Sequence, residues 1–269
     1  MAIKMIVSDL DGTMLNSSYR IPPENVAAVR EAMARGIIVT LATGRMYRSA
    51  KAYADELGLT APIITYNGAV VKKASGELIS GDFIPPQTVK AVLEYCLAAG
   101  CYVQLYCDGE YYYAERTETA RQYERACGVD GHAVGQDGLL ERLQHVEKLL
   151  LVGRDPLSAD KMALDLNIKF GGQIAAMKST AVYIEVIRPS VSKAGAMLRL
   201  AKSYGIKAEE IMALGDSDND LSMMMAAGCP VAMGNATENV RQAAKYISAD
   251  CEAGGVAEAI RKYALGGES

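Results

Sequence analysis

The sequence predicts an α/β protein whose core is a doubly wound parallel sheet, interrupted by an inserted α+β region. Short apolar runs alternate with helical patterns from residue 3 to residue 66 and again beyond residue 192. Between these segments the chain changes to tyrosine-rich runs with hairpin signals. We therefore expect residues 1–81 and 189–269 to form one core domain and residues 82–188 to form an inserted domain.

The first core segment contains three predicted strands, at residues 3–7, 37–42 and 62–66. Each is a continuous apolar run, which is the pattern of a parallel strand covered on both faces. A helix opened by Pro22-Pro23 and closed by Gly36 separates the first two strands, and a second helix ends near residue 57. This alternation predicts right-handed crossovers.

The inserted region mixes short strands and helices. Cys107-Asp108-Gly109-Glu110 has the composition of a hairpin turn between two strands. Helical patterns cover residues 89–99, 117–127 and 159–166, and strand-like runs cover residues 148–152 and 181–187. Pro85-Pro86 and Pro189 bracket the region, as expected for stiff connections between domains.

The second core segment resumes the alternation. Predicted strands at residues 211–214 and 231–233 are accompanied by helices at residues 194–204, 221–227, 237–244 and 256–263. Residues 266–269 have the composition of a disordered tail.

The composition excludes several classes of protein. A formal net charge of −4 gives no electrostatic reason to expect nucleic acid or a membrane surface as a partner, so small molecules are expected. Six cysteines without a Cys-x-x-Cys pair, and only two histidines, argue against a zinc site and a disulfide framework. We expect a cytoplasmic protein, since no signal peptide and no membrane-length apolar stretch is visible. The oligomeric state is left open.

Acidic residues directly follow two of the predicted strands. Asp9 and Asp11 come after the first strand, and the run Gly215-Asp216-Ser217-Asp218-Asn219-Asp220 follows the strand at residues 211–214. Open α/β sheets bind ligands at the carboxyl ends of their strands, where a carboxylate can bind a metal or attack phosphorus. Asp and Gly also favour turns, so a plain strand-to-turn connection is the alternative.

The run Asp9-Leu10-Asp11-Gly12-Thr13 resembles the first motif, Asp-x-Asp-Gly-Thr, of the haloacid dehalogenase (HAD) superfamily of phosphohydrolases. The resemblance implies a Rossmann-like core in which Asp9 is the nucleophile that forms an aspartyl-phosphate. It implies that Asp11 is the general acid and base, and that Leu10 is among the phosphate-binding residues.

Two further motifs follow in the family's order. Thr43-Gly44-Arg45 resembles the second motif, in which a hydroxyl holds a phosphoryl oxygen and the glycine lets backbone amides approach it; a threonine that caps the next helix is the alternative. Lys193 resembles the third motif, whose lysine neutralises the nucleophile and the phosphoryl group; a solvated surface lysine is the alternative. The Cof-type pattern has glycine directly after this lysine, whereas Ala194 stands here.

The acidic run at residues 215–220 is similar to the family's fourth motif, Gly-Asp-x-x-Asn-Asp. The resemblance implies a Mg²⁺ site formed by the carboxylates of Asp9 and Asp216 and the carbonyl oxygen of Asp11. By the same resemblance Asn219 contacts phosphate, and Asp220 orients groups of the site without binding the metal itself.

Other conspicuous residues have structural interpretations. The tyrosines of the inserted region either line a substrate pocket or form the partly buried core of a small sheet. Arg45 either meets an anionic substrate or lies at the surface, and Met223-Met224-Met225 is interpreted as packing. Asp218 is interpreted as a solvated charge. A Ca²⁺-binding loop over residues 216–220 is disfavoured, because Leu221 stands where such a loop needs glycine.

The motifs together predict a Mg²⁺-dependent phosphatase of small phosphorylated metabolites, sugar phosphates first. The insert resembles the cap of the Cof-type sugar-phosphatase branch, which implies a lid that excludes water and supplies specificity. A phosphomutase of the phosphomannomutase type is one alternative. A non-catalytic protein that binds phosphorylated metabolites is another, although binding alone does not require an acid/base residue such as Asp11.

Overall fold

A computed structural model describes residues 2–266, so residues 267–269 of the predicted tail lie outside the described part of the chain. The chain forms two compact units. Unit 1 consists of Met1–Ser80 and Ser192–Ser269, and unit 2 consists of Gly81–Val191. Among residues 2–266, no helix combines the length and the apolar composition needed to cross a bilayer.

Unit 1 is organised on a five-stranded sheet whose paired strands are all parallel. In the order β14-β13-β12-β1-β2, these strands are Tyr246–Ile247, Cys229–Ala232, Ile211–Gly215, Met5–Ser8 and Ile38–Leu41. The chain leaves β1 toward β2 and later returns as β12 on the other side of β1, so the end of β1 is a topological switch point. The predicted doubly wound parallel sheet is confirmed.

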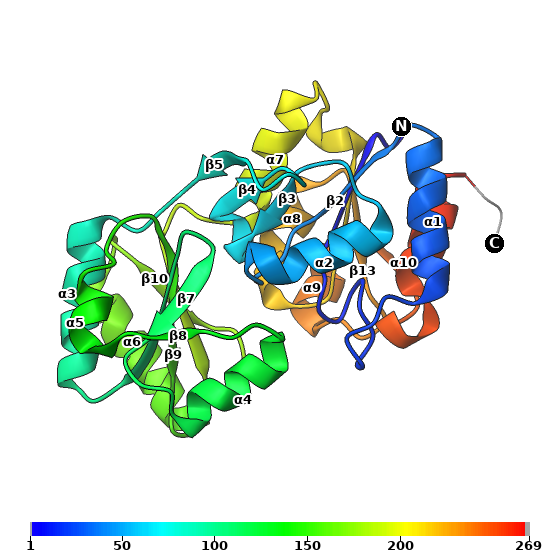
Figure 1. Ribbon diagram of the computed structural model, residues 1–269. Coiled ribbons are helices and arrows are strands. Elements are labelled where there is room, and N and C mark those ends of the chain that lie inside the picture. Colours follow the sequence, from blue (N-terminus) through cyan, green and yellow to red (C-terminus); the bar gives the residue numbers. More distant parts are fainter. Residues whose placement is uncertain (1, 267–269) are drawn as a thin grey trace. The chain divides into compact units, whose positions relative to one another are not determined.

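Alternating residues of β1 supply two apolar layers, one on each face of the sheet. Ile6 packs in a cluster with α1 (Pro23–Ala34), α2 (Tyr47–Leu57) and α10 (Gly255–Ala259). Met5 and Val7 pack in a second cluster with α7 (Lys193–Ser203), α8 (Leu221–Ala226) and α9 (Glu238–Ala243). Figure 1 shows α1 and α10 side by side on their face. Burial on both faces explains why these strands are continuous apolar runs.

A smaller sheet extends the β2 edge of unit 1. β3 (Ile63–Thr65) adjoins the end of β2 through a parallel bridge between Ala42 and Ile64. β4 (Val70–Lys72) pairs antiparallel with β3, and β5 (Leu78–Gly81) completes the three-stranded sheet. The turn η1 (Tyr66–Gly68) joins β3 to β4. Further short turns are η2 (Ala208–Glu210), η3 (Asp218–Asp220), η4 (Cys251–Ala253) and the π-helical η5 (Ile260–Ala264).

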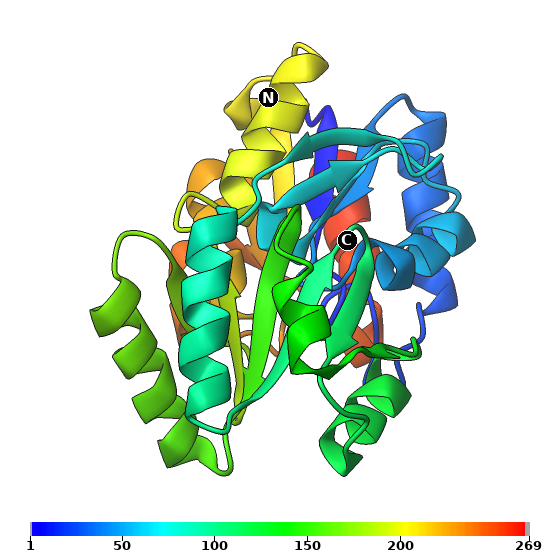
Figure 2. The same ribbon diagram turned by 60° about the vertical axis from the view of Figure 1, so that its left-hand side comes forward.

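Unit 2 is a six-stranded sheet with helices packed on one face. Its strands, in the order β10-β11-β9-β6-β7-β8, are Ala175–Lys178, Tyr183–Ile187, Val146–Val152, Tyr102–Cys107, Glu110–Tyr113 and His132–Ala133. The pairs are antiparallel except β7 with β8. One apolar cluster joins this sheet to α3 (Pro86–Ala98), α5 (Gly135–Leu140) and α6 (Pro156–Phe170), which Figure 2 shows on the same face. The remaining helix is α4 (Glu118–Cys127).

One expectation for the chain connections differs from the structure, and several short strands were not expected. Pro85-Pro86 lies inside unit 2, where Pro86 is the first residue of α3 and needs no backbone donor. The short strands β4, β5, β8, β10 and β14 were not predicted, because none has more than four residues and their sequences carry no clear apolar period.

The predicted hairpin at residues 107–110 is confirmed, since β6 and β7 pair antiparallel across it. Asp108 and Gly109 both have positive φ, at 53° and 84°, as a two-residue turn between twisted strands requires.

Replacing Gly109 by alanine tests this turn. A side chain at positive φ is strained, so we expect Gly109→Ala to lower the free energy of unfolding by about 1 kcal/mol. Urea denaturation followed by circular dichroism measures the effect. Asp108→Asn is the control and should retain wild-type stability, because asparagine tolerates this conformation. Equal stability of both variants and wild type would contradict the turn assignment.

Candidate active site

The carboxyl ends of neighbouring strands in unit 1 bring the predicted site residues together. Asp9 follows β1, Asp216 follows β12, and Thr43 stands two residues beyond β2. β1 lies between β12 and β2 in the sheet, so the three residues occupy one edge around the end of β1. Lys193 reaches the same place from the start of α7.

Lys193 is buried between two carboxylates. Its Nζ donates to Asp9 Oδ1 at 2.6 Å and to Asp220 Oδ1 at 2.6 Å, and its side chain has 0% exposure. Burial by itself lowers the pKa of Lys193, but the charges of Asp220 and Asp9 overcome that effect and raise it. Lys193 is therefore a permanent cation beside Asp9, and the interpretation as a solvated surface lysine is wrong.

The start of α7 fixes the direction of Lys193. Ser192 caps the helix by accepting a hydrogen bond from Gly195 N at 3.1 Å. Gly68 has φ +104°, and a Cβ there would lie 2.3 Å from Ser192 O, so η1 packs against the cap only because Gly68 has no side chain. Ala194 takes an ordinary helical position and donates its N–H to Ser222 Oγ at 3.3 Å. Alanine after the lysine therefore leaves Lys193 directed at Asp9.

Asp216 is held against the loop that follows β1. Thr13 Oγ1 donates to Asp216 Oδ1 at 2.9 Å, and burial raises the pKa of Asp216 to about 6. Gly12 has φ +75°, and a Cβ there would lie 2.5 Å from Asp216 Oδ2. Glycine is thus required at position 12 both for the turn and for the close approach of the second carboxylate.

Asp9, Asp216 and Asp220 form a group that fits a metal ion, since one oxygen of each lies within 4.8 Å of the others. Burial raises the pKa of Asp9 well above its usual value; Lys193 opposes this, and the neighbouring carboxylates add to it. A bound divalent cation would favour the ionised acids, and a donor set made only of oxygen suits a hard ion. Both oxygens of Asp220 are already engaged, Oδ1 by Lys193 and Oδ2 by the amides of Asp216 and Ser217.

The acids of residues 216–220 do not converge as they would in a Ca²⁺-binding loop. Asp218 is exposed and accepts a hydrogen bond from Thr237 Oγ1 at 2.9 Å, while Asp220 is directed to Lys193. Asp218 is therefore solvated, as expected, and also tethers the residue that caps α9.

Arg45 binds Asp11 with both arms of its guanidinium group. Nε donates to Oδ2 at 2.8 Å and Nη2 donates to Oδ1 at 2.6 Å, and the Arg45 side chain is only 16% exposed. The guanidinium lies 5.5 Å and 5.3 Å from the ring centroids of Tyr19 and Tyr53, and it also donates to Ser49. The sequence analysis left Arg45 either at the surface or in contact with a substrate. In the structure Arg45 instead binds the carboxylate of Asp11.

Thr43, Gly44 and Asn219 meet around an asparagine that the sequence analysis missed. Asn67 is 7% exposed with φ 57°; its N–H donates to Thr43 O at 2.9 Å, and its Oδ1 accepts from Asn219 Nδ2 at 3.1 Å. Gly44 lies against the same side chain. Thr43 does not cap α2, whose N-cap is Met46; its Oγ1 accepts from Arg45 N at 3.1 Å.

The structure also tests the interpretations of Leu10, of the three consecutive methionines and of the tyrosines in unit 2. Leu10 is buried in the apolar core, so only its backbone can face the site. Met223 and Met224 are buried, as the packing interpretation requires, but Met225 is 76% exposed. In unit 2, Tyr106, Tyr111 and Tyr113 are buried, in agreement with the sheet-core interpretation.

A buried cation, paired carboxylates and a hydroxyl at the carboxyl edge of a parallel sheet are the groups that phosphoryl transfer needs, so the fold and the site define a phosphate-ester hydrolase. Over residues 6–260 the chain matches the haloacid dehalogenase-like hydrolase family. The chain belongs to this family.

Relatives and solved structures agree with this assignment. YwtE of Bacillus subtilis, a 5-amino-6-(5-phospho-D-ribitylamino)uracil phosphatase, is 30% identical over 98% of this chain and 99% of its own length. The crystal structure of a haloacid dehalogenase-like hydrolase from Bacteroides thetaiotaomicron matches with a TM-score of 0.88 and 31% identity, covering 97% of this chain and 99% of that chain. The HAD subclass IIB sugar phosphatase BT4131 shares the fold, with a TM-score of 0.84 at 23% identity over 97% of this chain and 99% of that chain. The protein is therefore a phosphatase of small phosphorylated substrates.

Replacing Lys193 tests the centre of the site. We expect Lys193→Met to lower phosphate release at least about 100-fold, because the charge beside Asp9 is lost, and to lower Tm, because two buried carboxylates then face each other. Lys202→Met, at the exposed end of the same helix, is the control and should keep activity and Tm. Near wild-type turnover of Lys193→Met would contradict this assignment.

Proposed function

We propose that the protein is a Mg²⁺-dependent phosphatase that hydrolyses sugar phosphates and related esters through an aspartyl-phosphate on Asp9. The observation that carries the proposal is that the two acids of the first motif have different cationic partners. Asp9 is paired with the buried Lys193, and Asp11 is held by the less buried Arg45. Two carboxylates in different environments suit two different tasks.

Asp9 acts as the nucleophile in this proposal. Lys193 occupies Oδ1, so Oδ2 is the oxygen that forms the bond to phosphorus while the bond from phosphorus to the ester oxygen breaks. Asp11 gives a proton to that leaving oxygen and later removes one from the water that cleaves the aspartyl-phosphate. Phosphate leaves, and both acids return to their starting states.

The carboxylates of Asp9 and Asp216 and the carbonyl oxygen of Asp11 would hold Mg²⁺, which offsets negative charge on the phosphoryl oxygens when it is bound. Asp220 supports this arrangement through Lys193 and the amides of the loop. In this proposal Asp220 orients Lys193 and the loop amides, whereas Asp9 and Asp216 provide the carboxylates for the metal.

The phosphoryl group would be bound by Leu10, Thr43, Gly44, Lys193 and Asn219. Leu10 can contribute only its backbone, because its side chain is in the core. Asn67 does not need to contact the substrate. It links the Thr43 carbonyl to the Asn219 side-chain amide and so sets the spacing between Thr43 and Asn219.

Sugar phosphates are the first substrate class to test. The name of the relative YwtE describes a substrate with a phosphorylated ribityl chain, which is a polyhydroxylated phosphate ester. We propose that unit 2 acts as the specificity domain of the enzyme. A cytoplasmic location stays a prediction from the sequence.

Removing the nucleophile and the metal tests the mechanism. We expect Asp9→Asn to abolish phosphate release across a panel of phosphorylated sugars, polyols, nucleotides and cofactors, and EDTA to abolish it in the wild type until Mg²⁺ is restored. Asp218→Asn, outside the cluster, is the control and should remain active. Turnover by Asp9→Asn would rule out the aspartyl-phosphate. Isomerised substrate without free phosphate would favour the phosphomutase alternative.

Replacing Arg45 tests how Asp11 is positioned. A lysine cannot bind both oxygens of a carboxylate at once, so we expect Arg45→Lys to lower kcat about tenfold with little change in KM. Arg30→Lys is the control, since Arg30 is exposed and donates to the backbone oxygen of Glu56, away from the site. A rise in KM at constant kcat would instead assign Arg45 to substrate binding.

A further inference from the structure

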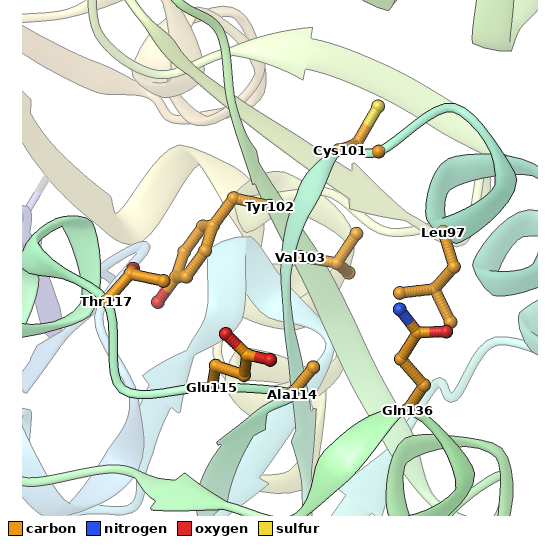
Figure 3. Close-up of a pocket in the computed structure, with 9 residues that line it drawn as sticks. Leu97, Cys101, Tyr102, Val103, Ala114, Glu115, Thr117 and Gln136 are labelled. Atoms are coloured by element: carbon orange, nitrogen blue, oxygen red, sulfur yellow. The ribbon is translucent and has the colours of Figure 1, made fainter.

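Unit 2 contains a pocket that the proposed reaction does not use. Its volume is about 280 Å³, and it is lined by the end of α3, the start of β6 and the segment after β7. Figure 3 shows Cys101 at one end of this pocket, Leu97 and Gln136 along one side, and Glu115 and Thr117 on the other side. Cys101 is partly exposed, so a small molecule that enters the pocket can reach this part of the chain.

A second thiol lies directly behind Cys101. The end of α3 is a Schellman motif, in which Cys101 N donates to Cys96 O at 2.9 Å and Gly100 N donates to Leu97 O at 3.0 Å, with Gly100 at φ +67°. This motif brings the third-last helical residue and the second residue beyond the cap into side-chain contact. Here both of those residues are cysteines.

The backbone hydrogen bond also limits the distance between the two residues. With standard bond lengths, a 2.9 Å contact from Cys101 N to Cys96 O keeps the two Cα atoms within about 6.8 Å of each other. A disulfide needs Cα atoms about 4.4–6.8 Å apart. The Cα separation of Cys96 and Cys101 therefore does not exceed the range that a disulfide can span.

The environments of the two thiols differ. Cys96 is 1% exposed, whereas Cys101 is partly exposed. The Cys96 thiol lowers the pKa of Cys101 by hydrogen bonding to it; partial burial opposes this, and the charge of Arg154 reinforces it. The same contact, together with burial, raises the pKa of Cys96. An accessible, more easily ionised thiol beside a buried one is the arrangement of an attacking and a resolving cysteine.

We propose that Cys101 and Cys96 form a redox-active dithiol, in which a peroxide oxidises Cys101 and Cys96 resolves the product to a disulfide. The Cys101 thiolate attacks one oxygen of hydrogen peroxide, the O–O bond breaks, and sulfenic acid and water form after proton uptake. The Cys96 sulfur then attacks the Cys101 sulfur, the S–O bond breaks, and a second water leaves. Two thiols lose two electrons, and one peroxide is reduced to two waters.

Differential alkylation of the full-length protein tests this proposal. The protein is treated with a few equivalents of hydrogen peroxide, free thiols are blocked with N-ethylmaleimide, and reduction exposes the oxidised thiols to iodoacetamide. We expect fragmentation spectra to place the second label on Cys96 and Cys101 together, and the intact mass before reduction to fall by two hydrogens. The buried Cys107 of the same peptide should carry the first label.

Three variants separate this pair from other cysteines. Cys101→Ser should remove the second label from both positions, and Cys96→Ser should leave a Cys101 that reacts with a sulfenic-acid probe and forms no bridge. Cys127→Ser is the matched control, because Cys127 is also partly exposed in unit 2 but its thiol contacts Val129 O. Bridging should persist in that variant. Absence of a Cys96–Cys101 bridge in a wild type that is oxidised elsewhere would overturn the proposal, and thermal melting shows that each variant is folded.

Discussion

The buried contact of Lys193 with Asp9 and Asp220 is the interaction on which unit 1 depends. The cation and both carboxylates lie within the core of the unit, at most 5% exposed, and none of the three could stay charged there without the others. Lys193 is 184 residues from Asp9 in the sequence. The contact therefore also joins the two chain segments that flank unit 2, so the site is complete only when both segments are in place.

The balance of charges in the site explains why a metal ion is expected there in addition to the Lys193 contact. When all four acids are ionised, Asp9, Asp11, Asp216 and Asp220 carry four negative charges against the two positive charges of Lys193 and Arg45, which leaves an excess of two negative charges at one edge of the sheet. A divalent cation matches that excess. Glycine at position 12 lets Asp216 approach closely enough to share it. The charge of Asp11 and the missing side chain of Gly12 thus meet two different requirements of the site from neighbouring positions of one loop.

The parts of the site that the sequence could predict are those carried by contiguous runs at strand ends. Asp9, Asp11 and Asp216 follow apolar strands, and a parallel sheet must bring such ends together. The contact of Arg45 with Asp11 spans 34 residues, and the arginine alone looks the same whether it is solvated or paired. Asn67 was also missed. Its position in an Asn-Gly pair after β3, at the same edge of the sheet, was a usable signal.

In unit 2 the alternation of β6 predicts two unlike faces, but not what the second face contains. Val103 and Leu105 pack with the helices, while the opposite face carries Gln104, Tyr106 and a Lys148–Glu185 pair at 2.7 Å. The two partners of that pair are 37 residues apart, so no local pattern indicates it. Apolar residues of the same volume often stabilise a core as well as a buried ion pair does. Packing alone therefore does not explain why this face is polar. The polar groups of this face are bonded to one another instead: Tyr106 Oη donates to Gln104 Oε1 at 2.7 Å, Gln104 Nε2 donates to Tyr102 Oη at 3.0 Å, and Lys148 donates to Glu185, so each buried polar group has a partner within the face.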